Sequence, residues 1–249
     1  MNIIFITDLH IGRAGEDTYG VDVRKNFLHV LSGIRKEQMD HLIIGGDLCY
    51  RDGDAVIYEW IKQQLDQLGV PYSIIAGNHD DPKLLASIFQ MQSDLKGGEL
   101  YYCKRFLNWN ALFLDTSSQK ISSIQLNWLE QQLATFASPA LIFMHHPPIN
   151  ASVSFMDENY PLLHQEEMQS LLKKNRQQFV IPIFTGHYHT EKTVVKDNLL
   201  LQITPSTYFQ IDQRSSDFKV DHYQIAYRRI ELGTDGWKSC VVYLEGAKL

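Results

Sequence analysis

Five short clusters of aspartate, asparagine and histidine lie along this chain, and each directly follows an apolar run that is typical of a buried strand. In a layered α/β protein, the ends of such strands converge on one edge, so clusters that are far apart in sequence meet in space. This pattern favours a fold in which all five strand ends share an edge. The clusters are Asp8-Leu9-His10, Gly46-Asp47, Gly77-Asn78-His79-Asp80, His145-His146 and Gly186-His187-Tyr188-His189.

Strand and helix patterns alternate in the first half of the chain. We expect strands at 2–7, 41–45 and 71–76, and helices at 27–34, 57–68 and 82–91. The second half is richer in strands, which we expect at 100–106, 111–115, 140–144, 179–184, 193–195, 199–203, 222–232 and 238–244.

Two further helices are expected in the second half, one after Ser122 and one at 165–174. Ser122 and Gln125 fit a capping box at the start of the first of these helices. Segment 147–164 has no clear periodicity, and we expect a long loop there, of the kind that is usually functional or mobile.

A βαβαβ first half followed by a strand-rich second half predicts an α/β fold with two packed mixed β-sheets and helices outside. We expect a four-layer αββα sandwich. The 249 residues contain no low-complexity linker and no internal repeat, so we expect a single domain over 1–249. The β-rich segment at about 193–249 is expected to complete the second sheet.

The composition narrows the class of protein. Hydrophobic residues make up 44% of the chain, which is enough for a large core, and the formal net charge is −6. An acidic chain lacks the global basic footprint that holds nucleic acid by its phosphates. The three cysteines form no CxxC motif, and no apolar stretch is long enough for a signal peptide or a membrane span. We expect a cytoplasmic protein with no membrane partner.

The five clusters together supply seven donors for two divalent metal ions, which sit ~3.5–4 Å apart in such sites. Asp8 and His10 alternate by two, which places both on one face of a strand. Asp47 has two oxygens and is our expected bridging ligand. The remaining donors are Asn78, His145, His187 and His189.

Carboxylate, amide and imidazole donors without thiolate suit Mn²⁺, Fe²⁺/Fe³⁺, Zn²⁺ or Co²⁺ better than Mg²⁺ or Ca²⁺. Each cluster alone has an ordinary explanation as a surface turn, because Gly, Asn and Asp are turn formers. The joint occurrence of all five after apolar strands is what predicts a metal site.

The ordered pattern D-x-H, GD, GNH[DE], H and GHxH resembles the signature of the calcineurin-like metallophosphoesterase superfamily, over nearly the whole chain. Within it, the chain is most similar to class III cyclic-nucleotide phosphodiesterases and related glycerophosphodiesterases. That narrower resemblance depends on His145-His146-Pro147-Pro148, on Thr204-Pro205-Ser206-Thr207 and on the terminal YRRIEL hairpin.

The resemblance implies two packed β-sheets with helices outside, and it implies a ligand set for each metal. His145 is implied rather than His146, because the family's ligand lies at the strand end, two residues before a proline. The first metal would take Asp8, His10, Asp47 and His189, and the second Asp47, Asn78, His145 and His187.

Such a site would hydrolyse a phosphate ester by in-line attack of a metal-bridging hydroxide on phosphorus. His79 directly follows Asn78 and is our expected proton donor to the leaving alkoxide. The alternative is that His79 only orients Asn78 or the phosphate. Aromatic residues that could stack a base, or simply anchor loops, are Phe155, Tyr160, Tyr208 and Phe209.

The expected function is hydrolysis of a small phosphodiester, with a cyclic nucleotide first and a glycerophosphodiester second. A nuclease is the runner-up, although the net charge does not favour a nucleic-acid partner. The metal donors would also serve a phosphomonoesterase. A catalytically inactive scaffold would have lost ligands, and none is missing here. The oligomeric state is open; edge pairing of the terminal hairpin would give a dimer.

Overall fold

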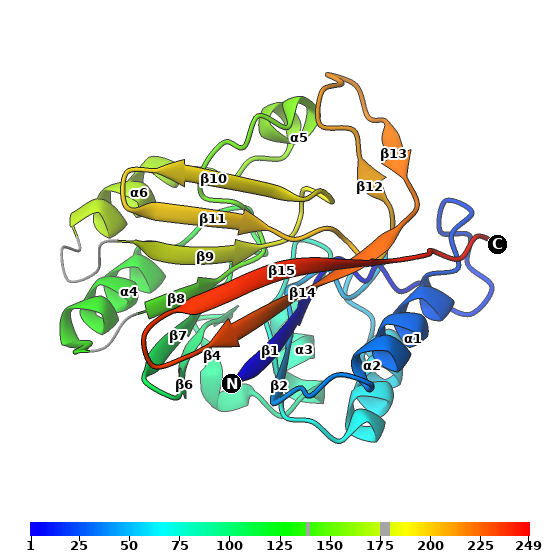
Figure 1. Ribbon diagram of the computed structural model, residues 1–249, viewed down its shortest axis with the longest axis horizontal. Coiled ribbons are helices and arrows are strands. Elements are labelled where there is room, and N and C mark those ends of the chain that lie inside the picture. The colour runs from blue at the N-terminus through cyan, green and yellow to red at the C-terminus, as the bar shows by residue number, and fades with distance from the viewer. Residues whose placement is uncertain (138–139, 175–179) are drawn as a thin grey trace.

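The computed structural model describes residues 1–137, 140–174 and 180–249. Two large β-sheets lie at its centre, with helices on the outside (Figure 1). The first sheet has the strand order β15-β14-β1-β2-β3. In that order, the strands are Trp237–Leu244, Ile225–Leu232, Asn2–Ile6, His41–Ile44 and Tyr72–Ile74.

The second sheet has the strand order β10-β11-β9-β8-β7-β6. Both sheets are mixed: β1, β2 and β3 run parallel, as do β7, β8, β9 and β11, and antiparallel strands complete each sheet. In sheet order, the strands of the second sheet are Lys192–Lys196, Leu199–Ile203, Ile181–Thr185, Ala140–Phe143, Trp109–Phe113 and Tyr102–Phe106.

Helices α1 (Val23–Ile34), α2 (Ala55–Leu68) and α3 (Pro82–Ile88) lie beside the first sheet, and α4 (Ser123–Thr135) and α6 (Gln165–Lys174) beside the second (Figure 1). A short helix α5 spans Ser154–Asn159. The minor elements are the 3₁₀ turn Gln92–Asp94 and the strands β4 (Leu95–Lys96), β5 (Glu99–Leu100), β12 (Gln210–Ile211) and β13 (Val220–His222).

Aromatic side chains fill the space between the two sheets. Phe5 of β1 lies 5.8 Å from Phe143 of β8 between ring centroids, and Phe184 of β9 lies 5.4 Å from Trp237 of β15. Within the second sheet, Phe113, Phe143 and Phe184 stack along neighbouring strands at 5.2 Å. Burial of such large rings contributes much of the hydrophobic stabilisation of a core. The two sheets are therefore joined by one continuous apolar layer.

The fold confirms the expected α/β architecture of two mixed sheets with helices outside. The expectation for segment 193–249 is wrong in part. Strands β10 and β11 do extend the second sheet, but β14 and β15 pair with β1 in the first. Sequence patterns mark strands without indicating the partner, and here the chain crosses back between sheets before its final hairpin.

Two local expectations differ from the structure, and a third falls partly outside the described residues. Ser122 does accept from the Gln125 backbone N–H, but the Gln125 side chain turns inward to bond the main chain of Asp115 instead of closing a capping box. Segment 147–164 contains helix α5. The expected strand at 179–184 is β9, and its first residue, Phe179, lies outside the described residues.

Among the described residues, no helix combines the length and apolarity needed to cross a lipid bilayer. Helices α1 and α2 are amphipathic and turn their apolar side chains toward the core.

Candidate metal centre

The predicted donors converge at the carboxyl ends of five strands, β1, β2, β3, β8 and β9. Backbone hydrogen bonds join the loops that follow these strands. The Asp8 amide donates to the Gly46 carbonyl at 3.0 Å, and the Gly186 amide donates to the His145 carbonyl at 3.1 Å. Loops from both sheets therefore meet at one edge, as the sequence pattern predicts.

Two glycines of the motifs leave the space that the donors occupy. A Cβ at Gly77 would lie 2.2 Å from Oδ1 of Asp47, and a Cβ at Gly186 would lie 2.5 Å from Oδ2 of Asp8. Such distances are far inside van der Waals contact, so any side chain at these positions would displace a carboxylate. The glycines of GNHD and GHYH are thus explained by close approach of the backbone to the site.

Five of the predicted donors have a left-handed backbone conformation. Their φ angles lie between 45° and 65°, a region that non-glycine residues rarely adopt. Strained residues of this kind persist only where the surrounding structure holds them, and they cluster at functional sites. The left-handed conformation also corrects one expectation: β1 ends at Ile6, so strand alternation does not place Asp8 and His10 together. The five donors are Asp8, His10, Asp47, His187 and His189.

One donor group consists of Asp8, His10 and His189, all buried. Nε2 of His10 lies 3.0 Å from Nε2 of His189, and Nε2 of His189 lies 3.4 Å from Oδ1 of Asp8. The Asp8 carboxylate is held in place by the backbone amide of His187, which donates to it at 3.1 Å.

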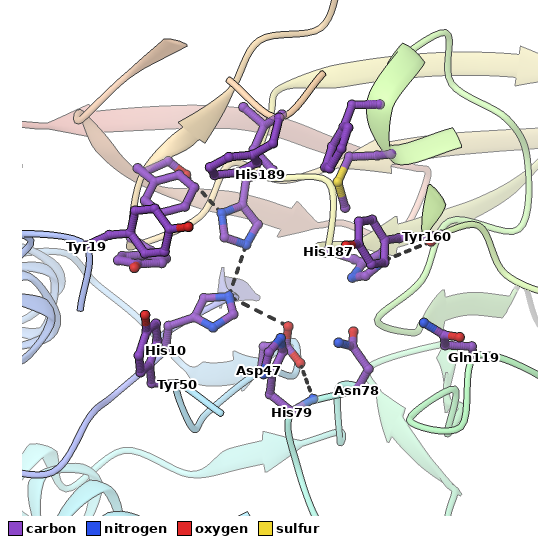
Figure 2. Close-up of a pocket in the computed structure, with 16 residues that line it drawn as sticks. His10, Tyr19, Asp47, Tyr50, Asn78, His79, Gln119, Tyr160, His187 and His189 are labelled. Atoms are coloured by element: carbon purple, nitrogen blue, oxygen red, sulfur yellow. Dashed lines mark hydrogen bonds and ion pairs between the residues drawn. The ribbon is translucent and has the colours of Figure 1, made fainter. Parts of the chain in front are cut away.

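A second group consists of Asp47, His145 and His187, also buried. Oδ2 of Asp47 lies 3.2 Å from Nε2 of His145 and 3.7 Å from Nε2 of His10. Asp47 therefore faces both groups at once, which is the position of a bridging ligand. Figure 2 shows it at the centre of the cavity floor, between His10 and Asn78.

The second nitrogen of three histidine rings is bound to a backbone carbonyl, which can only accept. Nδ1 of His145 donates to Gly45, Nδ1 of His189 donates to Phe209, and Nε2 of His187 donates to Tyr160. These bonds are 2.8, 3.0 and 2.9 Å long. They fix the orientation of each ring and leave its other nitrogen available for a metal ion, the usual arrangement of metal-ligating histidine.

Three buried donor atoms have no hydrogen-bond partner within the described chain: Nδ1 of His10, Oδ1 of Asn78 and Nε2 of His145. Burying a polar atom without a partner costs about 1–3 kcal/mol. Ligation would satisfy Oδ1 of Asn78 and Nε2 of His145, which fits a centre that binds cations; in His10 it is Nε2 that faces His189 and Asp47. Carboxylate, amide and imidazole together suit the borderline divalent ions expected from the sequence.

The pKa values of the donor side chains are shifted because these groups are buried and lie close to one another. Burial would raise the pKa of Asp47, but the neighbouring His145 imidazole lowers it well below its usual range. Burial would lower the pKa of His145, yet the carboxylates of Asp47 and Asp8 raise it to about 9. Burial lowers the pKa of both His10 and His187 to about 3, so these two rings are neutral and able to ligate at neutral pH.

The structure separates the adjacent histidines of the His145-His146 pair. His145 belongs to the group around Asp47. His146 turns toward Thr116, whose hydroxyl lies 2.9 Å from its Nδ1, and its ring lies 4.0 Å from that of His187. Both rings are buried, but only the first has a nitrogen facing a carboxylate.

His79 lies at the edge of the donor groups and is partly exposed. Its Nδ1 bonds to the Arg51 carbonyl at 2.6 Å, which leaves Nε2 free, and its backbone amide donates to Oδ1 of Asp47 at 2.9 Å. The ring lines the cavity beside His10, with 5.1 Å between ring centroids. His79, His10 and Asp47 also form a third close set of donor atoms.

Asp80 has a structural role that the sequence did not indicate. Its carboxylate accepts from the backbone amides of Leu48, Cys49 and Gly77 and from the Tyr58 hydroxyl, at 2.9 to 3.3 Å. Burial raises the pKa of this carboxyl to about 6. It therefore ties the loop after β2 to the loop after β3. Its position next to His79 in the GNHD motif indicated that it lies near the site, but not that it has this structural role.

The donor groups form the floor of a cavity of about 600 Å³ (Figure 2). The walls are largely aromatic. The expected residues Phe155, Tyr160, Tyr208 and Phe209 all line the cavity. Six further lining residues were not anticipated from the sequence. They are Tyr19, Tyr50, Gln119, Met156, Ile211 and Phe218.

Sequence comparison gives the family directly. Residues 1–191 match the model of the calcineurin-like phosphoesterase family. A probable cyclic nucleotide phosphodiesterase from Fibrobacter succinogenes is 33% identical over 96% of this chain and 92% of its own length. The 3′,5′-cyclic adenosine monophosphate phosphodiesterase CpdA from Escherichia coli is 29% identical over 95% of this chain and 86% of its own.

The fold also resembles that of a solved structure. A dimetal phosphatase from Danio rerio superposes with a TM-score of 0.68 at 16% identity, covering 98% of this chain and 97% of that one. At this identity, the likeness bears on the fold alone. The matched family model, the relative from Fibrobacter succinogenes and the donor groups at the strand ends show that the chain belongs to the calcineurin-like phosphoesterase family, as a metal-dependent hydrolase.

Proposed function

We propose that this protein hydrolyses a small phosphodiester, with a 3′,5′-cyclic nucleotide as the leading substrate, at a centre for two divalent cations. The observation that carries the proposal is the position of Asp47, whose carboxylate faces His10 on one side and His145 on the other. One carboxylate between two sets of buried donors is the arrangement that a pair of cations requires.

The residues that would hold the cations are those predicted from the sequence. Asp8, His10 and His189 would hold the first, Asn78, His145 and His187 the second, and Asp47 both. When bound, Mn²⁺, Fe²⁺/Fe³⁺, Zn²⁺ or Co²⁺ would activate water near neutral pH and neutralise charge on the phosphoryl oxygens. The unpartnered Oδ1 of Asn78 supports its inclusion, and the close contact with Asp47 supports His145 over His146.

His79 is proposed to protonate the leaving alkoxide. Its Nδ1 is engaged by the Arg51 carbonyl, so Nε2 is the atom that could exchange a proton with a substrate in the cavity. Its partial exposure at the rim of the cavity suits a group that must take up a new proton from solvent after each turnover.

The cavity supports a small substrate with one phosphate. Among the described residues that line it there is no lysine or arginine, so the metal centre would be the main source of positive charge there. A nuclease needs basic side chains along the strand that it binds. Aromatic walls suit a nucleoside better than glycerol, and cyclic nucleotides are the substrates named for the two relatives above.

We also propose a cytoplasmic location. All three cysteines are unpaired, and the buried Cys49 has the pKa of its thiol raised by burial, so it is inert. Unpaired thiols suit a reducing compartment.

The test compares hydrolysis of bis(p-nitrophenyl) phosphate and p-nitrophenyl phosphate, with added Mn²⁺ and with chelator, beside Asn78→Ala. A diester preference that needs metal and disappears in the variant supports the proposal, and cleavage of cyclic AMP then identifies the substrate class. Preference for the monoester would instead identify a phosphatase. A diesterase that leaves cyclic AMP intact would contradict the cyclic-nucleotide assignment.

A further inference from the structure

Three aromatic rings form a connected cluster at the mouth of the cavity. Tyr19 lies in the loop between β1 and α1, Phe209 lies just before β12, and Phe218 lies just before β13. The ring centroids are 6.0 Å apart for Tyr19 and Phe218, 6.1 Å for Tyr19 and Phe209, and 5.9 Å for Phe209 and Phe218. Three loops from distant parts of the chain thus bring their aromatic residues to one place.

Two of these rings are open to solvent. Tyr19 is 61% exposed and Phe218 is 41% exposed, whereas Phe209 beneath them is buried. Large aromatic side chains that are exposed together beside a cavity are typical of ligand-binding surfaces. Each exposed ring contacts the buried Phe209, but a large part of its own surface remains outside the core.

The cluster is joined directly to the metal centre. The ring of Phe209 lies 5.3 Å from the ring of His189, and the Phe209 carbonyl accepts the hydrogen bond from Nδ1 of His189. One imidazole therefore separates the cluster from the position of a cation. Because all three rings line the same cavity as the donor groups, a phosphate bound at the centre would leave the rest of a nucleotide beside them.

The loops that carry the exposed rings are held without a ligand. The Gly20 amide donates to Asp17, and the Gly20 carbonyl accepts from the Leu249 amide, both at 2.9 Å. Near Phe218, the Lys219 ammonium pairs with Asp212 at 2.7 Å. Loops held in advance lose little conformational entropy when a ligand binds, so less of the stacking free energy is spent on ordering them.

We propose that Tyr19, Phe209 and Phe218 form a stacking subsite for the nucleobase of the substrate. This inference rests on the proposed function and adds the residues that would distinguish a nucleoside phosphodiester from a glycerophosphodiester. Every base offers a flat π face, so the subsite selects for the presence of a base more than for its identity.

The experiment measures equilibrium binding of adenosine 5′-monophosphate and of ribose 5-phosphate to the Mn²⁺-supplemented protein by calorimetry. The two ligands share a phosphate and a ribose and differ by the base. We expect the first to bind about tenfold more tightly, which corresponds to about 1.4 kcal/mol of stacking. In the double variant Tyr19→Ala, Phe218→Ala, this preference should fall to near one while the affinity for ribose 5-phosphate stays the same.

Two variants control for unrelated effects. Tyr19→Phe keeps the ring and should keep the preference. Val195→Ala removes an exposed apolar side chain on β10, outside the cavity, and should change neither affinity. Guanosine and cytidine 5′-monophosphates should bind within a few fold of the adenosine compound.

Equal affinities of the wild-type protein for the two ligands would overturn the subsite. So would a double variant that loses both ligands equally, since the rings would then only support the metal centre. These outcomes are independent of turnover. A clear preference for the base in a protein that does not cleave cyclic AMP would contradict the proposed substrate and leave the subsite standing.

Discussion

The hydroxyl of Tyr188 donates a hydrogen bond of 2.9 Å to the Asp157 carboxylate of helix α5. Tyr188 lies between His187 and His189, so the same turn that presents two proposed ligands also holds α5 over the cavity. Asp157 also accepts from the backbone amides of Ala151 and Val153. The loop that forms one wall of the cavity is therefore fixed to the metal centre.

Tyr188→Phe should release α5 without removing a proposed ligand. One hydrogen bond to a partly buried carboxylate contributes about 1–2 kcal/mol. We expect KM for a diester to rise about fivefold, because the wall supplied by Phe155 and Tyr160 loosens, with a smaller change in kcat. Tyr243→Phe removes a hydroxyl that donates to Glu191 at the surface and should leave both constants unchanged. A large loss of kcat with unchanged KM would contradict this role.

Binding of metal should raise the melting temperature of the protein. The centre holds two unpartnered buried donors, Oδ1 of Asn78 and Nε2 of His145, and two buried carboxylates, so the folded state gains interactions that the unfolded chain cannot form. At a free metal concentration of a hundred times Kd, the gain is about 2.7 kcal/mol. Scanning calorimetry with Mn²⁺ and with chelator measures it. Asp47→Asn should largely abolish the difference; a full response in this variant would argue against a bridging role for Asp47.

The proposed role of His79 predicts a dependence on the leaving group. His79→Gln should lower kcat by about 10²–10⁴ for alkyl esters such as cyclic AMP, whose leaving group needs a proton. A nitrophenyl leaving group needs none, so its loss should be small. The metal content of the variant must equal that of the wild type, because His79 also lies near His10 and Asp47. Equal losses on both substrates would exclude proton donation.

Arg228 is buried at the boundary between the sheets and should matter for stability. Its guanidinium donates to Thr204, Gln202 and the Ile203 carbonyl of the second sheet and to Ser239 of β15, at 2.7 to 3.0 Å. Burial lowers its pKa to about 10, which leaves it charged at neutral pH.

Arg228→Met should therefore reduce the free energy of unfolding by about 2–3 kcal/mol, because four acceptors lose their donor. Urea unfolding measures the change. The neighbouring Arg229 offers a matched control, since its exposed side chain pairs with Glu37 and Glu231 at the surface. Arg229→Met should cost less than 1 kcal/mol. Similar costs for the two variants would mean that the buried bonds contribute little.

The buried side chain of His41 should make the free energy of unfolding depend on pH. Burial, with a further contribution from Lys104, lowers the pKa of His41 to about 4 in the folded protein, against 6.5 in the unfolded chain. The unfolded chain thus takes up a proton first as pH falls. His41 is neutral in the fold at pH 7, and stability should decline between about pH 6.5 and 4, by roughly 1 kcal/mol per unit.

Denaturant unfolding of wild type and His41→Gln across this range isolates the effect, because other groups titrate in both proteins. The variant should show a shallower decline. His29→Gln, at an exposed position of α1, should follow the wild-type curve. Parallel curves for wild type and His41→Gln would refute the assignment.

Sequence patterns predicted the element types and the edge where the donors meet, because apolar runs and turn residues are local signals. They did not predict which sheet the final hairpin joins. Strand β14 pairs with β1 from the opposite end of the chain, and nothing within its eight residues specifies that partner. Arg228 shows the same limit: nothing in its local sequence indicates that the second sheet covers it.

The candidate site was predictable in its donors and less so in its surroundings. Each donor lies in a short motif that directly follows an apolar strand, and this combination indicates a metal site. The roles of Asp80 and of the ring of Tyr19 depend on contacts between loops that are distant in sequence, such as Leu48 with Asp80 and Tyr19 with Phe218. Tertiary packing alone creates these contacts, so a single sequence holds no local trace of them.

The division of the donors between the two sheets has a consequence for assembly of the protein. Asp8, Asp47 and Asn78 follow strands of the first sheet, whereas His145, His187 and His189 follow strands of the second. Neither half holds a complete set, so the centre comes into being only when the halves dock. Cation uptake during refolding would therefore show when the two halves dock. A fragment that contains only one of the sheets should be unable to retain both ions.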